Sequence, residues 1–201
     1  MEANKKKITD HMQDLGALIA LVLLVVGIGI VSPEFRTWSN FLSLLRQSSI
    51  NGLIAFGMTC VILTDAIDLS VGSVLALSTA LCAGMISNGV PAGAAMLAAL
   101  VIGAGLGAIS GLLVTKGRLQ AFIATLITMT VYRGATMIFT GGKPISNLGD
   151  SFVLKLVGRG NFYRIPIPVI LLLLVFAGFY FLLNKTTFGR AVYATGSNWK
   201  C

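Results

Sequence analysis

The sequence predicts an all-α fold, a polytopic membrane helical bundle with about six transmembrane helices in 201 residues. Composition is the first reason, because 56% of the residues are hydrophobic and only 11% are charged. Soluble domains carry about 25% charged residues, so this chain has too few to coat a globule in water. The mean hydropathy of +0.89 agrees with this interpretation. An ordinary soluble enzyme, a disordered chain and a disulfide scaffold are therefore excluded.

The length of the apolar runs is the second reason. A helix needs about 20 mainly apolar residues to cross the hydrocarbon core of a bilayer, and several runs approach or exceed that length. The runs show no strict alternation of polar and apolar residues, so they predict helices rather than the strands of a barrel.

A basic tail, residues 1–14, precedes the first predicted span at residues 15–31. This apolar run is longer than the core of a secretory signal, and residues 32–34, Ser-Pro-Glu, lack the small-x-small pattern of a cleavage site. We therefore expect a retained span. After a polar connector, residues 47–64 are free of charge and predict a second, short span.

The next stretch, residues 69–115, contains no charged residue and is long enough for two crossings. Its middle reads Asn-Gly-Val-Pro at residues 88–91, which are typical turn residues. The third and fourth predicted spans are therefore residues 71–87 and 92–115.

Two more spans follow. Residues 119–142 are apolar except for Arg133, and residues 165–184 form an apolar run with two prolines near its start, where a helix tolerates them. Residues 143–164 between these spans predict a surface segment with a short amphipathic piece. The membrane domain thus covers residues 15–184, and residues 185–201 form a polar C-terminal segment.

Basic residues indicate the orientation in the membrane, because short cytoplasmic loops are enriched in Lys and Arg. A cytoplasmic N-terminus places one set of basic residues inside: Lys5, Lys6, Lys7, Lys116, Arg118, Lys185, Arg190 and Lys200. The outside then receives a smaller set: Arg36, Arg46, Lys143, Lys155, Arg159 and Arg164. We therefore expect the N-terminus and the 185–201 segment to be cytoplasmic.

Three glycines recur every four residues in the fourth span: Gly103, Gly107 and Gly111. A helix face without side chains lets a neighbouring helix approach closely. We therefore predict tight helix packing there, with a sliding surface during transport as the alternative.

Catalytic, metal and nucleic-acid functions find no support in the residues. His11 is the only histidine and has no evident nucleophile as a partner, and no phosphate-binding loop is present. The spacing of Cys60, Cys82 and Cys201 fits neither a zinc site nor a redox pair. No aromatic-basic pattern suggests nucleic acid. We therefore expect that the chain is not an enzyme and binds neither a cofactor nor a metal. Any ATP hydrolysis is expected to take place on another chain.

Ionisable groups inside or beside membrane spans are costly and usually functional, and Asp65, Asp68 and Arg133 are of this kind. Asp68 is placed to cap the third span by accepting from its free N–H groups. One alternative is that Asp65, Asp68 and Ser70 line a translocation path or gate, and another is that they lie in a simple aqueous loop. Arg133 is either an ion-pair partner of an aspartate or another residue of that path.

Three motifs in order carry a resemblance to ribose-type ABC sugar permeases. Residues 66–77, Ala-Ile-Asp-Leu-Ser-Val-Gly-Ser-Val-Leu-Ala-Leu, resemble that family's Gly-Ile-Asp-Leu-Ser-Val-Gly-Ser signature, with Ala66 where glycine is usual. Residues 124–134 and 139–145 are similar to its fifth helix and the exit from it. Residues 187–198, Thr-Phe-Gly-Arg-Ala-Val-Tyr-Ala-Thr-Gly-Ser-Asn, are similar to its cytoplasmic coupling loop.

The resemblance implies a permease subunit of the bacterial inner membrane, which forms a homodimer in the lipid bilayer. Such a dimer works with a cytoplasmic subunit that binds ATP-Mg and with an extracytoplasmic sugar-binding protein, and it imports a monosaccharide such as ribose. The resemblance also implies that a group of residues docks onto the ATP-binding subunit: Phe188, Gly189, Arg190, Gly196 and Asn198. Because the binding protein selects the sugar, few convergent polar groups are expected in the spans.

Members of that family have about ten transmembrane helices and continue past this loop, so we expect the 201 residues to be the N-terminal part of a permease. Two other functions stay open. One is a branched-chain amino acid ABC permease, which uptake competition between ribose and leucine would distinguish. The other is an ion-coupled secondary carrier, whose uptake would survive ATP depletion.

Overall fold

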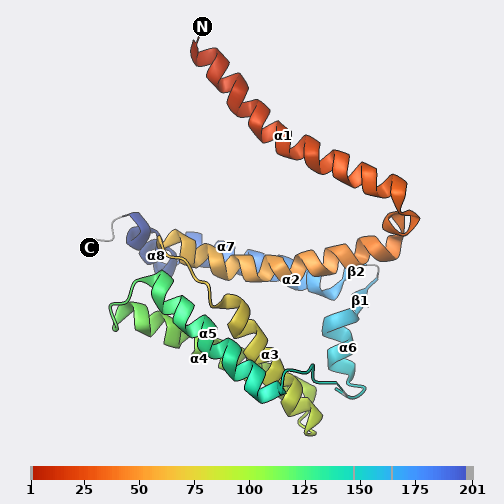
Figure 1. The fold of residues 1–201 in the computed structure, drawn as a ribbon, viewed down its shortest axis with the longest axis vertical. Coiled ribbons are helices and arrows are strands. Elements are labelled where there is room, and N and C mark those ends of the chain that lie inside the picture. Colours follow the sequence, from red (N-terminus) through yellow and green to blue (C-terminus); the bar gives the residue numbers. More distant parts are fainter. Residues whose placement is uncertain (1, 147, 164, 198–201) are drawn as a thin grey trace. The chain divides into compact units, whose positions relative to one another are not determined.

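A computed structural model describes residues 2–146, 148–163 and 165–197, and these fall into two compact units. The first unit, residues 1–47, contains the long helix α1 (Glu2–Val31), the 3-10 turn η1 (Pro33–Arg36) and the start of α2 (Trp38–Leu63). Figure 1 shows these elements in order along the chain.

The entry into α2 is fixed by side chains of the first unit. The hydroxyl of Thr37 accepts the Asn40 backbone N–H at 3.2 Å, as an N-cap residue does, and donates to the Glu34 carbonyl at 2.7 Å. The Asn40 side-chain amide donates to the Phe35 carbonyl at 3.1 Å. The polar connector predicted between the first two spans is therefore an ordered turn with its own hydrogen bonds.

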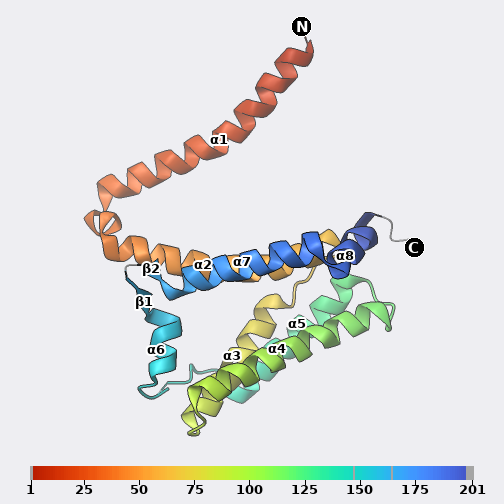
Figure 2. The ribbon, with the colours of Figure 1, turned by 180° about the vertical axis from the view of Figure 1, so that it is seen from behind.

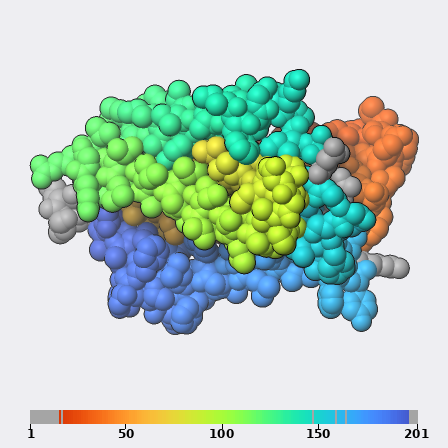
Figure 3. Space-filling model, turned by 90° about the horizontal axis from the view of Figure 1, so that it is seen from below, coloured from red at the N-terminus to blue at the C-terminus, as the bar shows by residue number. Residues whose placement is uncertain are grey.

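The second unit, residues 48–201, contains a group of three packed helices: α3 (Val71–Ser87), α4 (Ala92–Thr115) and α5 (Ala121–Thr140). These helices lie side by side in both ribbon views (Figures 1 and 2). Small residues make the close packing possible, since Ala95 and Ala124 are completely buried. The α3–α4 turn at residues 88–91 is exposed and lies at the surface in Figure 3.

Buried hydroxyl groups join α4 to α5. The Ser110 hydroxyl donates to the Thr128 hydroxyl at 3.0 Å, and the Tyr132 hydroxyl donates to the Leu106 carbonyl at 2.9 Å. Ser110, Thr128 and Tyr132 are all buried. Hydrogen bonds of this kind hold helices together where lipid supplies no hydrophobic driving force.

After α5 the described part of the second unit continues with three helices and two short strands. The elements are α6 (Phe152–Arg159), β1 (Asn161–Phe162), β2 (Ile165–Pro166), α7 (Ile167–Lys185) and α8 (Thr187–Ser197). The two strands pair antiparallel, with Phe162 opposite Ile165. The aromatic ring of Phe56 in α2 contacts the rings of Phe176 and Phe179 in α7, with both pairs of centroids 5.7 Å apart.

The prediction of an all-α polytopic bundle is confirmed, since each predicted span lies in a helix. The predicted bounds of the third and fourth spans are those of α3 and α4, whereas α2 begins nine residues before its predicted span. By length and composition, α4, α5 and α7 could each cross a membrane, and residues 18–31 and 71–87 are shorter apolar helices. Large apolar side chains such as Leu100 and Leu174 are exposed on these helices, as lipid contact requires.

The glycine stripe does not form one packing face within the described chain. A Cβ added at Gly103 would meet Ser78 of α3 at 3.9 Å, whereas one added at Gly107 or Gly111 would have no described atom within 4 Å. The reason is helical geometry: four residues advance about 40° beyond a full turn. Gly103 and Gly111 therefore point about 80° apart, and Ser110 takes the place in the interface that the stripe predicted for Gly111.

Candidate functional site

The end of α2 adopts an uncommon backbone conformation at Asp65, one of the aspartates singled out by the sequence. The Asp65 N–H donates to the Ile62 carbonyl at 3.0 Å, and the Ala66 N–H donates to the Val61 carbonyl at 3.2 Å. This pair of hydrogen bonds is a Schellman motif, which requires a left-handed residue that is usually glycine. Asp65 occupies that position with a φ of 57°. Aspartate tolerates it better than most residues.

Residues 64–70, which we call the α2–α3 linker, run without helical structure from this motif to α3. Asp68 lies in the linker, half-buried, and its Oδ1 accepts hydrogen bonds from both the N–H and the hydroxyl of Ser70, each at 2.7 Å. Ser70 is the N-cap residue of α3 and only 1% exposed.

The predicted capping role of Asp68 therefore needs correction. Its carboxylate receives the N–H of the cap residue Ser70 and none of the first helical N–H groups among the described residues. The first helical N–H groups belong to residues 71–73, whereas Asp68 Oδ1 already accepts two hydrogen bonds from Ser70. Asp68 thus fixes the linker where it enters α3, and Ser70 begins the helix.

α5 anchors the middle of the linker. The Thr125 hydroxyl lies 3.3 Å from the Ile67 carbonyl, while it also donates to the Ala121 carbonyl of its own helix at 2.8 Å. Within the described residues, the backbone N–H groups of Ile67, Asp68 and Leu69 donate to no acceptor. Backbone N–H groups without a protein acceptor need water or another polar partner.

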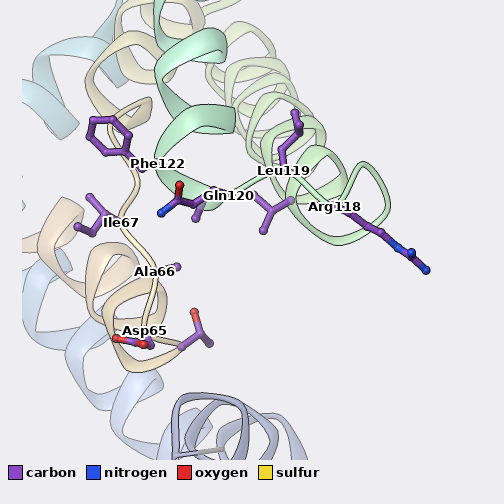
Figure 4. Close-up of a pocket in the computed structure, with 10 residues that line it drawn as sticks. Asp65, Ala66, Ile67, Arg118, Leu119, Gln120 and Phe122 are labelled. Carbon is purple, nitrogen blue, oxygen red and sulfur yellow. The ribbon is translucent and has the colours of Figure 1, made fainter. Parts of the chain in front are cut away.

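Two adjoining pockets flank the linker. The larger, of about 720 Å³, lies between the linker and the α4–α5 connection at residues 116–120. Figure 4 shows the Gln120 side chain pointing toward the linker and the Arg118 side chain pointing away from it. The smaller pocket, of about 200 Å³, lies between the linker and the facing ends of α4 and α5, with Asp68, Ser110 and Thr125 among its polar residues.

Arg133 lies elsewhere. It is exposed on α5, two turns beyond Thr125, and makes no ion pair with Asp65 or Asp68 in the part of the chain that the structure describes. An ion pair does form outside the spans, between Lys155 and Asp150. Within the described residues the structure therefore shows no ion pair for Arg133, and its place in a translocation path stays a prediction.

The segment predicted to be a coupling loop is the helix α8. Thr186 separates it from α7, and the Thr186 hydroxyl accepts the Gly189 N–H at 3.4 Å. Gly189 and Val192 are buried, whereas Phe188 and Arg190 are exposed. Of the residues predicted to dock onto a partner, Gly189 thus faces inward, and Phe188 and Arg190 face outward. Asn198 lies outside the described residues.

Two glycines of α8 allow its backbone to lie close to its neighbours. A Cβ at Gly189 would overlap the Leu183 carbonyl of α7, and one at Gly196 would overlap the Leu63 carbonyl at the end of α2. Only glycine fits such close backbone approaches. α8 therefore contacts the residue from which the α2–α3 linker departs.

The sequence analysis missed Thr125, Ser110 and Gln120 as residues near this site. A signal for one of them was present, because Thr125, Thr128 and Tyr132 recur at helical spacing and place hydroxyl groups on one face of α5. Gln120 gave no such signal, since its place beside the linker depends on how two distant segments meet.

Comparison with known proteins identifies the family. The profile described as branched-chain amino acid transport system / permease component matches residues 40–200. The ribose import permease protein RbsC of Bacillus subtilis is 53% identical over 189 residues, which are 94% of this chain and 59% of that protein. The same-named protein of Haemophilus influenzae is 46% identical over 201 residues, covering 98% of this chain and 62% of the relative.

A D-allose transport system permease protein, AlsC of Escherichia coli, is 37% identical over 190 residues, covering 91% of this chain and 56% of the relative. The chain thus spans about three-fifths of the length of the curated relatives that it matches. No solved structure gives a significant match. Together with its apolar helices, these matches make the chain a multi-pass membrane protein that belongs to the family described as branched-chain amino acid transport system / permease component.

Proposed function

We propose that this chain belongs to the permease subunit of an ABC importer that carries ribose or a similar neutral monosaccharide across the bacterial inner membrane. The observation that carries the proposal is the similarity to relatives named as ribose import permeases, at 44–53% identity over 90–98% of the chain. The family description names branched-chain amino acids, but the D-allose permease relative also favours a sugar.

The proposed partners are a second copy of the permease, a cytoplasmic subunit that binds and hydrolyses ATP-Mg, and an extracytoplasmic sugar-binding protein. In the proposed orientation the tail with Lys5, Lys6 and Lys7 is cytoplasmic. Two crossings then return the chain to the cytoplasmic side at Leu63. α8 contacts Leu63 and would lie on that same side, where an ATP-binding subunit can reach it.

In the proposed mechanism the outer residues of α8, Phe188 and Arg190, meet the ATP-binding subunit. Gly189 and Gly196 keep the helix against the ends of α7 and α2, so a displacement of α8 reaches the α2–α3 linker through Leu63. The linker flanks both pockets. ATP binding by the partner would thereby change the packing around the linker.

Uptake tests the substrate. The complete gene, expressed with its partner genes in bacteria that lack ribose import, should restore accumulation of labelled ribose. Unlabelled ribose should compete and unlabelled leucine should not. Competition by leucine instead of ribose would contradict the proposal. So would uptake that persists after ATP depletion and is lost when an ion gradient is dissipated.

A charge reversal tests the docking role of α8. Arg190→Glu in the complete permease should leave membrane insertion intact while it lowers ribose uptake and the ATPase stimulation by the sugar-binding protein several-fold. Lys116→Glu is the matched control, because it reverses a charge in the α4–α5 connection outside α8. Normal uptake by the Arg190→Glu variant would overturn the docking assignment.

A further inference from the structure

The smaller of the two pockets has a lining rich in hydroxyl groups. Four of its residues carry them, Thr64, Ser110, Thr115 and Thr125, and Asp68 supplies a carboxylate. Apolar residues complete the wall: Val61, Ala66, Ile67, Gly111, Val114 and Ala121. The pocket thus combines several neutral polar groups with aliphatic surface in about 200 Å³.

The hydrogen bonds of these hydroxyl groups determine what they can offer to a ligand. Thr64 and Thr115 each donate to a backbone carbonyl at 2.8 Å, those of Val61 and Gly111. Ser110 donates to the Thr128 hydroxyl. A hydroxyl has one proton to donate and two lone pairs, so each of these oxygens remains able to accept. The pocket is therefore a concentration of acceptors.

The charge balance favours a neutral ligand. The pocket has no Lys, Arg or His in its lining, so an anion would find no compensating charge. Its one carboxylate, on Asp68, already accepts two hydrogen bonds from Ser70, which weakens its pull on a cation. The adjoining linker also carries backbone N–H groups without acceptors in the described chain, at Ile67, Asp68 and Leu69. These can donate to a ligand or to water.

We propose that this pocket is a subsite for a small neutral polyol on its way through the permease. The hydroxyl groups of a monosaccharide donate to the acceptors of Ser110, Thr115 and Thr125, and its C–H faces lie against Val61 and Val114. Scattered, partly engaged acceptors bind weakly, which suits a solute that must enter and leave. This inference rests on the proposed function and names where the solute meets the helices.

Gly111 makes the pocket testable. It lines the pocket, and a side chain added there meets no described atom within 4 Å. Gly107 lies one turn earlier on the same helix with equally open space, but it does not line the pocket. The two glycines form a matched pair: the same substitution adds the same volume to α4, inside the pocket in one case and outside it in the other.

The experiment compares Gly111→Leu with Gly107→Leu in the complete permease, reconstituted in liposomes with its ATP-binding subunit and sugar-binding protein. A side chain that fills the pocket should lower labelled ribose uptake by about tenfold or more, while the ATPase stimulation by the sugar-binding protein persists. Gly107→Leu should retain uptake. Equal uptake by the two variants, or an equal loss in both, overturns the subsite. Absence of ribose uptake by the wild-type assembly instead overturns the proposed function.

A cysteine variant provides a readout that needs no transport. Gly111→Cys and Gly107→Cys are placed in a complete permease whose native cysteines, Cys60, Cys82 and Cys201 among them, are replaced by alanine. Labelling by a small methanethiosulfonate reagent is then followed over time. Ribose at millimolar concentration should slow labelling at position 111 and leave position 107 unchanged. Labelling at position 111 that ribose does not slow contradicts occupancy of the pocket.

Discussion

The α-carbon of Gly196 in α8 lies against the backbone carbonyl of Leu63, the last residue of α2, so closely that a Cβ at residue 196 would overlap that oxygen. The same Cβ would lie 3.5 Å from the α-carbon of Thr64, the first residue of the α2–α3 linker. Backbone thus meets backbone at this point. No flexible side chain separates the two segments there.

Gly196→Ala should separate α8 from the end of α2. We expect a cost of about 1–3 kcal/mol, as for other overpacked contacts, and a loss of ATPase stimulation in the assembled importer. Detergent-solubilised thermal unfolding and ATPase assays measure the two effects. Gly178→Ala in α7 is the control, because its Cβ has open space in the described structure. Equal behaviour of the two variants would show that the close contact is dispensable.

Asp65→Gly should be tolerated and Asp65→Val should not. Asp65 has a φ of 57°, which glycine adopts freely and a β-branched residue adopts at a cost of about 1–2 kcal/mol. Thermal unfolding of the purified permease should therefore rank Asp65→Gly at or above the wild type and Asp65→Val below it. The reverse order would mean that the carboxylate, rather than the backbone, determines this position.

The hydrogen bond between Ser110 and Thr128 should contribute modestly to stability. A double-mutant cycle with Ser110→Ala and Thr128→Val is expected to give a coupling energy of about 0.6 kcal/mol, the average for hydrogen bonds between membrane helices. Thr130→Val is the control, because the Thr130 hydroxyl bonds only within α5 among the described residues. A coupling energy near zero for Ser110 and Thr128 would contradict the contact.

Glu34 gives a pH prediction outside the spans. A hydrogen bond from its own backbone N–H and one from the Ser32 hydroxyl, at 3.0 Å, lower the pKa of the Glu34 carboxyl below 4.5. Ionised Glu34 therefore stabilises the folded turn at pH values above the ordinary pKa of about 4.5. This contribution is lost as the pH falls from about 4.5 through the lowered pKa. Ser32→Ala should raise the pKa of Glu34, as carbon-detected NMR titration would measure. An unchanged pKa would rule out a contribution from Ser32.

Local chemistry explains what the sequence predicted well. The Asn-Gly-Val-Pro turn at residues 88–91 and the basic residues at 116–118 lie next to the helix ends themselves, so the predicted bounds of α3 and α4 agree with the structure. The helix α8 was missed because its sequence, rich in polar and small residues, has no long apolar run. The inner face of α8 is defined by its contacts with α7 and with the end of α2. The contact with α2 joins residues that are far apart in the sequence, so the sequence alone does not predict it.

The candidate site was predictable only in part. Asp65 and Asp68 stand out in the sequence because charges beside apolar runs are rare, and both line pockets. Thr125 contacts the Ile67 carbonyl of the linker, 58 residues away, and this contact exists only once the linker lies against α5. The roles of Asp65, Asp68, Ser70 and Arg133 in transport stay predictions.

The links between the packed helices have a consequence for the environment in which the protein works. The bond from Ser110 to Thr128 and the one from Thr125 to Ile67 join groups that carry no charge over the physiological pH range. Acidification of the medium and changes in salt therefore leave these links intact. The exposed pair of Lys155 and Asp150 lies outside the spans, where salt screens it. These two contacts should accordingly persist across media of very different acidity and salinity, while the exposed pair of Lys155 and Asp150 responds to them.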